Sequence, residues 1–181
     1  AFFQSVTTRT AGFASISQSG LTNGSKLLAS MLMIIGGSPA GTAGGIKTTT
    51  VAVLLLTAIS VLRGNKDTEC YGRKITFEII RVGITITLVT FVFWLFGVTV
   101  MTVIEPQQKV LDLMFEATSA MATVGLTVDL TPVLSDISHV VLMLMMYIGR
   151  IGPMTMALIF SGHVDKKNQF RTLPEAKIMV G

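Results

Sequence analysis

Long apolar stretches alternate with short polar ones along this chain. Residues 82–104 contain no charged side chain and are long enough to cross roughly 30 Å of hydrocarbon as one helix. Residues 138–164 form a second such stretch, with one full charge, Arg150, near its middle. Residues 23–62 form a third, which a glycine-rich segment interrupts. We therefore predict three membrane crossings, one of them built from two helices and a break.

A shorter stretch, residues 108–121, has the length of a helix that enters the membrane and returns on the same side. It follows Pro106, and helices often begin just after a proline. The pattern predicts a re-entrant helix here.

Composition agrees with an integral membrane protein. Half of the residues are hydrophobic, 13% are charged and the mean hydropathy is +0.68, whereas about a quarter of the residues in a soluble domain are charged. The chain opens without an initiator Met or a basic start, so we expect its N-terminal part to be missing.

The charges predict an orientation. Basic residues gather in 63–74 and in the tail from Asp165, which the positive-inside rule places in the cytoplasm. On the other side, only Lys109 accompanies five acidic residues. These are Glu105, Asp112, Glu116, Asp129 and Asp136. We expect an acidic outer face that attracts cations.

The segment GGSPAGTAGGIKTTT, which interrupts the third stretch, has the look of a phosphate-binding loop. A Walker loop needs a glycine directly before its lysine, but Ile46 separates Gly45 from Lys47. The apolar run that follows also argues against a soluble nucleotide-binding unit. A nucleotide site stays a minor alternative. The ten residues 36–45 include five glycines and a proline, a composition that breaks a helix.

Sliding the chain along itself by 113 residues, the separation of Gly12 from Gly125, aligns two related units. Phe2 meets Phe115, TAGF at 10–13 meets TVGL at 123–126, and the order of matches extends over the following helix. We predict a unit of outer helix, re-entrant helix, T-x-G loop and inner helix, present twice.

The T-x-G loops are candidate cation ligands. Irregular backbone at membrane depth is tolerated where it lines an aqueous path, and its carbonyls can replace the hydration shell of an ion. Glycine permits the φ angles that this requires. The alternative is that both glycines are ordinary turn residues outside the membrane. The candidate residues are Thr10, Ala11, Gly12, Thr123, Val124 and Gly125.

Four motifs carry a family resemblance: FFQSVTTRTAGF, SPAGTAGGIKTTT, ATSAMATVGLT and YIGRIGPMT. Together they resemble the Trk/Ktr/HKT superfamily of potassium transporters, most closely its KtrB-type membrane subunits, over nearly the whole chain. The resemblance implies an all-α integral membrane fold in which four helix–pore-loop–helix (M1-P-M2) repeats surround one pore, as in a potassium channel. This chain then holds the last two repeats, the first of them without its M1 helix.

The resemblance also implies a division of the chain. Residues 1–62 would form the third pore repeat, 63–74 a cytoplasmic linker, 75–164 the fourth repeat and 165–181 a cytoplasmic tail.

Site roles follow from the resemblance in the same way. The six T-x-G residues would form a selectivity filter that binds potassium through backbone oxygens. The glycine-rich segment would be an intramembrane gate, for which a passive kink is the alternative. Its residues are Gly36, Gly37, Ser38, Pro39, Ala40, Gly41, Thr42, Ala43, Gly44 and Gly45.

Two basic residues belong to this interpretation. Arg150 should face the protein interior, because a charge at mid-membrane is costly elsewhere. We interpret it as a latch that repels the cation and donates to gate carbonyls; a structural ion pair is the alternative. Lys47 either joins the gate or extends toward the cytoplasm.

The expected function is potassium uptake across a bacterial plasma membrane without covalent chemistry, by a multi-pass protein that is not an enzyme. Sodium coupling stays open. The resemblance implies potassium as the bound ion and no organic cofactor. It implies as partners the N-terminal half of the transporter, a second membrane subunit, a ring of KtrA-type nucleotide-binding regulatory subunits and lipid, but no nucleic acid. A Trk-type subunit and a non-conducting membrane scaffold are the alternatives.

Overall fold

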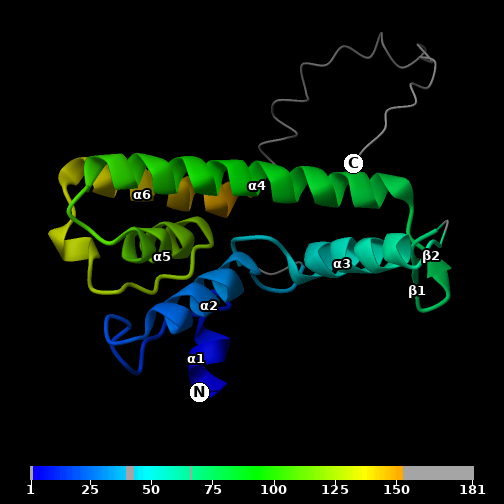
Figure 1. The fold of residues 1–181 in the computed structure, drawn as a ribbon, viewed down its shortest axis with the longest axis horizontal. Helices are drawn as coiled ribbons and strands as arrows, with labels where there is room; N and C mark the ends of the chain where they lie inside the picture. The colour runs from blue at the N-terminus through cyan, green and yellow to red at the C-terminus, as the bar shows by residue number, and fades with distance from the viewer. Residues whose placement is uncertain (1, 40–42, 66, 153–181) are drawn as a thin grey trace, which may run out of the picture.

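The computed structural model describes residues 2–39, 43–65 and 67–152, and these are mostly helical. Three gate residues, Ala40, Gly41 and Thr42, lie outside the described residues, as does the expected tail from Asp165. The elements follow one another along the chain (Figure 1). They are α1 (Phe2–Thr7), α2 (Asn23–Ile34), α3 (Thr48–Leu62), β1 (Glu69–Cys70), β2 (Arg73–Lys74), α4 (Phe77–Ile104), α5 (Val110–Met121), the 3-10 turn η1 (Thr131–Val133) and α6 (Asp136–Ile151).

Helix α4 runs along the length of the molecule in Figure 1 and contains the whole predicted crossing 82–104. Within the described part of the chain, α4 alone is long and apolar enough to cross a membrane, by length and composition. Helix α3 is also apolar but shorter. The mostly helical fold with one long apolar helix is consistent with the predicted class.

The interrupted stretch 23–62 forms two helices, α2 and α3, separated by residues 35–47. A helix, a glycine-rich break and a second helix are what its composition predicts. Helix α2 begins after Thr22, whose hydroxyl accepts a hydrogen bond from the amide of Ser25 at 3.3 Å. The linker between α3 and α4 contains the two-stranded hairpin β1–β2, with Tyr71 and Gly72 at its tip.

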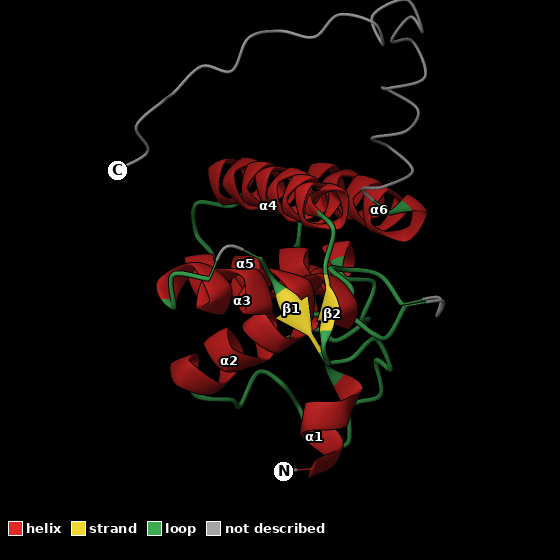
Figure 2. Cartoon of the chain, turned by 90° about the vertical axis from the view of Figure 1, so that its right-hand side faces the viewer, coloured by secondary structure: helices red, strands yellow, loops and turns green. Residues whose placement is uncertain are grey.

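Helix α5 covers residues that were predicted to form a re-entrant helix, and it is the centre of the packing. It contacts α2, α4 and α6, so both described units meet on it (Figure 2). Its side chains Leu113 and Phe115 are completely buried. One apolar cluster joins α5 to α4 and α6, and another joins α5 to α2 and to residues 122–128.

Glycines on one face of α4 fit it against two partners. Gly97 lies against the side chain of Met145 on α6, where an added Cβ would overlap the Met145 sulfur. Gly83, nearer the N-terminus of the same helix, faces Thr50 and Leu54 of α3. Helix α4 thus packs against α3 and α6 along its length. Many large apolar side chains on its other faces are exposed.

The two inner helices begin in the register that the internal alignment predicts. Helix α2 starts at Asn23 and α6 at Asp136, and these positions are 113 residues apart. Hydroxyl residues, Thr22 and Ser135, occupy the two N-cap positions. The second predicted crossing, 138–164, is described only as far as Gly152.

Candidate ion-binding site

The two T-x-G turns, residues 10–12 and 123–125, share an unusual backbone conformation. Thr10 and Gly12 have φ angles of +63° and +73°, and Thr123 and Gly125 have φ angles of +53° and +90°. The central residues, Ala11 and Val124, are not among the positive-φ positions. Positive φ is costly for a threonine, so its occurrence at both equivalent positions is a specific property of these turns.

Each turn bonds back to the helix before it. The amides of Ala11 and Gly12 donate to the Thr7 carbonyl at 3.2 and 3.3 Å. In the second turn, the Val124 amide donates to the Ser119 carbonyl at 2.9 Å. Alternating handedness along a short segment turns successive amides to one side. These amide hydrogen bonds hold each turn against the end of the helix that precedes it.

The turns touch each other. A Cβ built on Gly12 would overlap the Val124 carbonyl oxygen, and a Cβ on Gly125 would come within 3.9 Å of the Gly12 Cα. No side chain fits between them. Two segments that are 113 positions apart therefore bring a pair of glycine backbones together, as one composite site would require.

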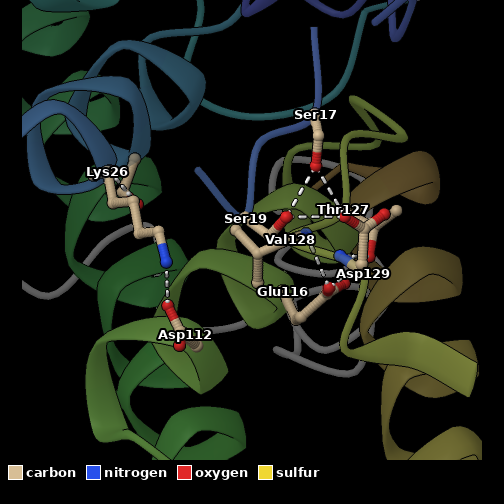
Figure 3. A network of polar contacts seen from close by, with 9 residues as sticks. Ser17, Ser19, Lys26, Asp112, Glu116, Thr127, Val128 and Asp129 are labelled. Carbon is tan, nitrogen blue, oxygen red and sulfur yellow. Dashed lines mark hydrogen bonds and ion pairs between the residues drawn. The ribbon is translucent and has the colours of Figure 1, made fainter. Parts of the chain in front are cut away.

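Polar contacts brace the segments behind the turns. The Thr7 hydroxyl donates to the Phe13 carbonyl at 2.6 Å across the first turn. On α5, the buried Glu116 carboxylate accepts from the Val128 amide at 3.0 Å, from the Thr131 hydroxyl at 3.1 Å and from the Thr127 hydroxyl (Figure 3). The second turn thus lies between its own helix and a return segment that this helix holds.

A further contact joins the two return segments. The hydroxyls of Ser17 and Ser19 donate to one Asp129 oxygen at 2.7 and 2.8 Å (Figure 3). These hydrogen bonds lower the pKa of Asp129. Asp129 thus links the two return segments on their exposed side.

Backbone hydrogen bonds join the two ends of the glycine-rich loop, residues 35–47, and we call this pairing the neck of the loop. The Gly36 amide donates to the Ile46 carbonyl at 2.9 Å, and the Ile46 amide donates to the Ile34 carbonyl at 3.0 Å. Gly45 has a φ of +70°, and a Cβ on Gly36 would overlap the Gly44 carbonyl oxygen. The glycines thus allow the chain to reverse twice in little space.

This loop reaches the second T-x-G turn. The Gly44 amide donates to the Thr123 hydroxyl at 3.2 Å, and a Cβ on Gly44 would lie 2.7 Å from the Ala122 carbonyl oxygen. Lys47 lies at the end of the loop, and its ammonium donates to the Ala43 carbonyl. Of the two alternatives for Lys47, the structure therefore shows a contact within the loop.

Arg150 lies in the last turn of α6 and is exposed. Together with Glu116, Thr123 and Gly125, it lines a cavity of about 500 Å³ beside the second T-x-G turn. The prediction that Arg150 lies next to the gate was based on its alignment with Gly37. The structure places it on the cavity that the second turn borders.

Glu116, one of the five acidic residues expected on the outer side, is buried and only 4% exposed. The Asp112 carboxylate forms an ion pair with the Lys26 ammonium, at an N–O distance of 2.7 Å. Glu105 lies between α4 and α6, where hydrogen bonds from Ser135 and Ser138 lower its pKa. Four of the five acidic residues, Glu105, Asp112, Glu116 and Asp129, thus face a donor on another segment and join elements of the fold.

The chemistry of the site is that of oxygen ligands. Within residues 2–39, 43–65 and 67–152, no three His, Cys, Asp or Glu side chains lie close enough together to hold a metal ion. The T-x-G turns offer backbone carbonyls and threonine hydroxyls, and the two turns lie in contact. Such oxygens suit hard cations, and a set of neutral carbonyls suits a monovalent one.

Sequence reasoning missed the Lys26–Asp112 pair and the role of Glu116. One signal was present, since Asp112 and Glu116 are four residues apart and so share a face of α5. Their partners lie on other segments, which the spacing does not identify.

Comparison with known proteins identifies the family. Residues 1–171 match the TrkH family, described as cation transport proteins. The chain is 37% identical over 180 residues to the Ktr system potassium uptake protein B of Bacillus subtilis (strain 168). The aligned region covers 99% of this chain and 40% of that protein. The chain is 37% identical over 183 residues to the potassium/sodium uptake protein NtpJ of Enterococcus hirae, in an alignment that covers 99% of this chain and 41% of that protein.

A third relative, the Ktr system potassium uptake protein B of Vibrio alginolyticus, is 35% identical over 161 residues, 89% of this chain and 35% of that protein. The chain thus spans about two fifths of the length of the curated relatives it matches. These relatives are bacterial and are named as transporters, not enzymes. The chain belongs to the TrkH family of cation transport proteins.

Proposed function

We propose that this chain is part of the ion-translocating subunit of a potassium uptake system in a bacterial plasma membrane. The observation that supports this most directly is the contact between the two T-x-G turns, in which Gly12 lies against the Val124 carbonyl. The family match and the names of the relatives give the substrate class. Potassium is the transported ion, and the chain needs no organic cofactor for this task.

The turns act as one half of a selectivity filter. Carbonyl oxygens of Thr10, Ala11, Thr123 and Val124 replace water around the ion, and the remaining ligands come from the N-terminal half of the same transporter. The 113-residue register of α2 and α6 supports two pore repeats, the first without its M1 helix. The exposed apolar side chains of α3, α4 and α6 then face lipid, the missing half or a second membrane subunit.

The glycine-rich loop acts as the gate. Its closed neck and its contact with Thr123 support a compact plug on the inner side of the filter. Residues 36–45 and Lys47 form the plug. Arg150, which lines the cavity beside the second turn, acts as the latch of the closed state. Its fixed positive charge opposes a passing cation.

The system is of the Ktr type in this proposal, since two of the relatives are named as Ktr subunits. Regulatory subunits that bind a nucleotide then act from the cytoplasm on the linker 63–74 and on the tail 165–181. A Trk-type subunit is the second candidate. The relative named as a potassium/sodium uptake protein favours a test of sodium coupling in either case.

The test uses the full-length parent protein reconstituted in liposomes. We expect uptake of potassium or rubidium that exceeds sodium uptake and that Gly12→Ser and Gly125→Ser weaken. Protein that is folded in liposomes but carries no monovalent cation would leave the non-conducting scaffold as the better function. Uptake with no change in affinity or selectivity in both glycine variants would remove the filter assignment.

A further inference from the structure

Lys26 and Asp112 form a largely buried ion pair between the two units. The Lys26 ammonium lies 2.7 Å from an Asp112 oxygen, and the two side chains are 8% and 20% exposed. A lysine is rarely buried to this degree unless it is paired. The residues are 86 positions apart, so the pair results from the tertiary fold (Figure 3).

Each residue lies in the first turn of a helix whose other end reaches the site. Helix α2, which carries Lys26, ends at Ile34 at the neck of the glycine-rich loop. Helix α5, which carries Asp112, ends at Met121, two residues before Thr123. The carboxylate also lies where a helix N-terminus favours negative charge.

The two helices are joined at both ends. Lys26 and Asp112 hold their first turns together, and the Gly44–Thr123 hydrogen bond joins the segments that follow their last turns. Between these polar contacts, one apolar cluster packs α2 against Phe115. A change in the spacing of α2 and α5 would therefore move the loop relative to the T-x-G turn.

A second carboxylate extends the connection from α5 to the turn itself. Glu116, one helical turn after Asp112, accepts hydrogen bonds from the Val128 amide and the Thr131 hydroxyl. The position of α5 thus also sets the position of the return segment behind Val124 and Gly125. The position of α5 therefore affects both the contact of the second turn with the glycine-rich loop and its contact with the return segment.

The second unit has no lysine at the position equivalent to Lys26. Its counterpart in the second unit, 113 positions later, is His139. The His139 ring lies 3.0 Å from the Thr131 carbonyl, within its own unit. Lys26 thus contacts the other unit, whereas His139 contacts its own unit. This difference is expected if Lys26 serves to join α2 to α5.

We propose that Lys26 and Asp112 are positioning residues for ion selectivity: their ion pair sets the spacing of α2 and α5, and through it the geometry of the second T-x-G turn. Binding sites need their first ligands held to a fraction of an ångström by supporting contacts. Breaking one side of a buried pair leaves an uncompensated charge, which draws water between the helices. This inference rests on the proposed potassium function.

The experiment compares variants of the full-length protein in liposomes. Lys26→Met and Asp112→Asn each remove one charge, and the double exchange Lys26→Asp with Asp112→Lys restores a pair in reverse. The matched control is Lys74→Met, measured in liposomes without the regulatory subunits that are proposed to act on the linker. Lys74 forms an exposed ion pair with Asp67 on the β1–β2 hairpin, with side chains 63% and 48% exposed. Uptake is normalised to folded protein, and the potassium KM, the maximal rate and the potassium-to-sodium ratio are measured separately.

We expect each single variant to lower the potassium-to-sodium ratio by roughly tenfold, since displacement of a site by about 1 Å can cost ~100-fold in rate. The double exchange should recover part of the loss, and Lys74→Met should match the unmodified protein. Single variants with an unchanged KM and ratio, and only less folded protein, would overturn the inference and leave the pair a purely structural role. So would a double exchange that is no better than the worse single variant.

The unmodified protein separates this inference from the proposed function. If it transports potassium selectively while the variants keep its ratio, the function stands and the positioning role is refuted. If it transports no potassium, the proposed function is refuted and the positioning role with it.

Discussion

The backbone amide of Gly44 donates a hydrogen bond to the Thr123 hydroxyl at 3.2 Å, so the glycine-rich loop contacts the second T-x-G turn directly. Gly44 has no room for a larger side chain there, since an added Cβ would lie 2.5 Å from that hydroxyl oxygen. If the loop acts as the proposed gate, this hydrogen bond would anchor it to the proposed filter. The contact also makes Thr123 a member of both the candidate filter and the candidate gate.

Replacing Thr123 with valine tests this anchor. The isosteric valine removes the acceptor and leaves the Gly44 amide without its partner, a change that costs about 1–3 kcal/mol for a buried donor. We expect the loop to detach more readily and the maximal flux of the full-length transporter to rise. Thr123→Ser, which keeps the hydroxyl, is the control. Equal flux in both variants and in the unmodified protein would show that the bond does not restrain the loop.

Gly12→Ala should weaken potassium binding through both strain and contact. The φ of +73° costs an alanine roughly 1–2 kcal/mol, and the new Cβ would displace the Val124 carbonyl. The control is Gly64→Ala, where φ is +70° but nothing lies within 4 Å of the added Cβ. We expect a raised potassium KM for Gly12→Ala alone. If both variants raise it equally, backbone strain and not the contact between the turns is responsible.

Neutralising Arg150 should increase flux. With Arg150→Gln the fixed positive charge beside the second turn disappears, and the barrier to a cation falls. Arg150→Lys keeps the charge and serves as the control. Rubidium uptake into liposomes, corrected for folded protein, is the measurement. A fall in flux in normally folded Arg150→Gln protein would favour a structural ion pair over a latch.

Shortening the glycine-rich loop should also raise flux. Removing residues 40–44 deletes its tip, including the Gly44 donor, while the neck bonds between Gly36 and Ile46 can persist. We expect uptake that no longer depends on the regulatory subunits. Unaltered flux and unaltered regulation in the deletion would show that the segment is a passive kink.

Glu105 should make stability depend on pH in the acid range. Hydrogen bonds from Ser135 and Ser138 hold the folded-state pKa of Glu105 below its ordinary value of 4.5. Because the folded pKa is the lower one, this stabilisation is present above pH 4.5 and is lost as the pH falls through the folded pKa. Glu105→Gln should therefore lower the Tm at neutral pH.

The difference in Tm between the Glu105→Gln variant and the unmodified protein should shrink as the pH falls below 4.5. Thermal unfolding of purified protein in detergent, followed across this range, measures it. A difference that stays constant with pH would mean that the variant acts through packing and not through the charge of the carboxylate.

Much of the fold could be predicted from residue patterns. An uncharged apolar run must satisfy its own backbone hydrogen bonds in lipid, and this favours a helix over 82–104. Five glycines and a proline within residues 36–45 oppose a helix, so the break between α2 and α3 follows from local composition. The shift of 113 residues likewise predicts the register in which α2 and α6 begin. All of these are local properties of the backbone.

The candidate site could be predicted only in part. The T-x-G turns are visible as a repeated pattern, but their contact is not, because it depends on how α1 and α5 approach each other. Glu116 was counted only as one charge of an acidic outer side, and the fold buries it against the return segment 127–131. Charge alone does not distinguish a solvated carboxylate from one that meets three donors.

The order of residues along this chain therefore sets where helices form, where they break and which turns carry glycine, since each of these depends on neighbours a few positions apart. Which partner Lys26 finds, which carbonyl Gly12 meets and which hydroxyl anchors Gly44 depend on residues that are 79 to 112 positions apart. Those pairings arise when packing around α5 brings the segments together, because an ion pair or a close backbone contact depends on distance in space and not on distance along the chain.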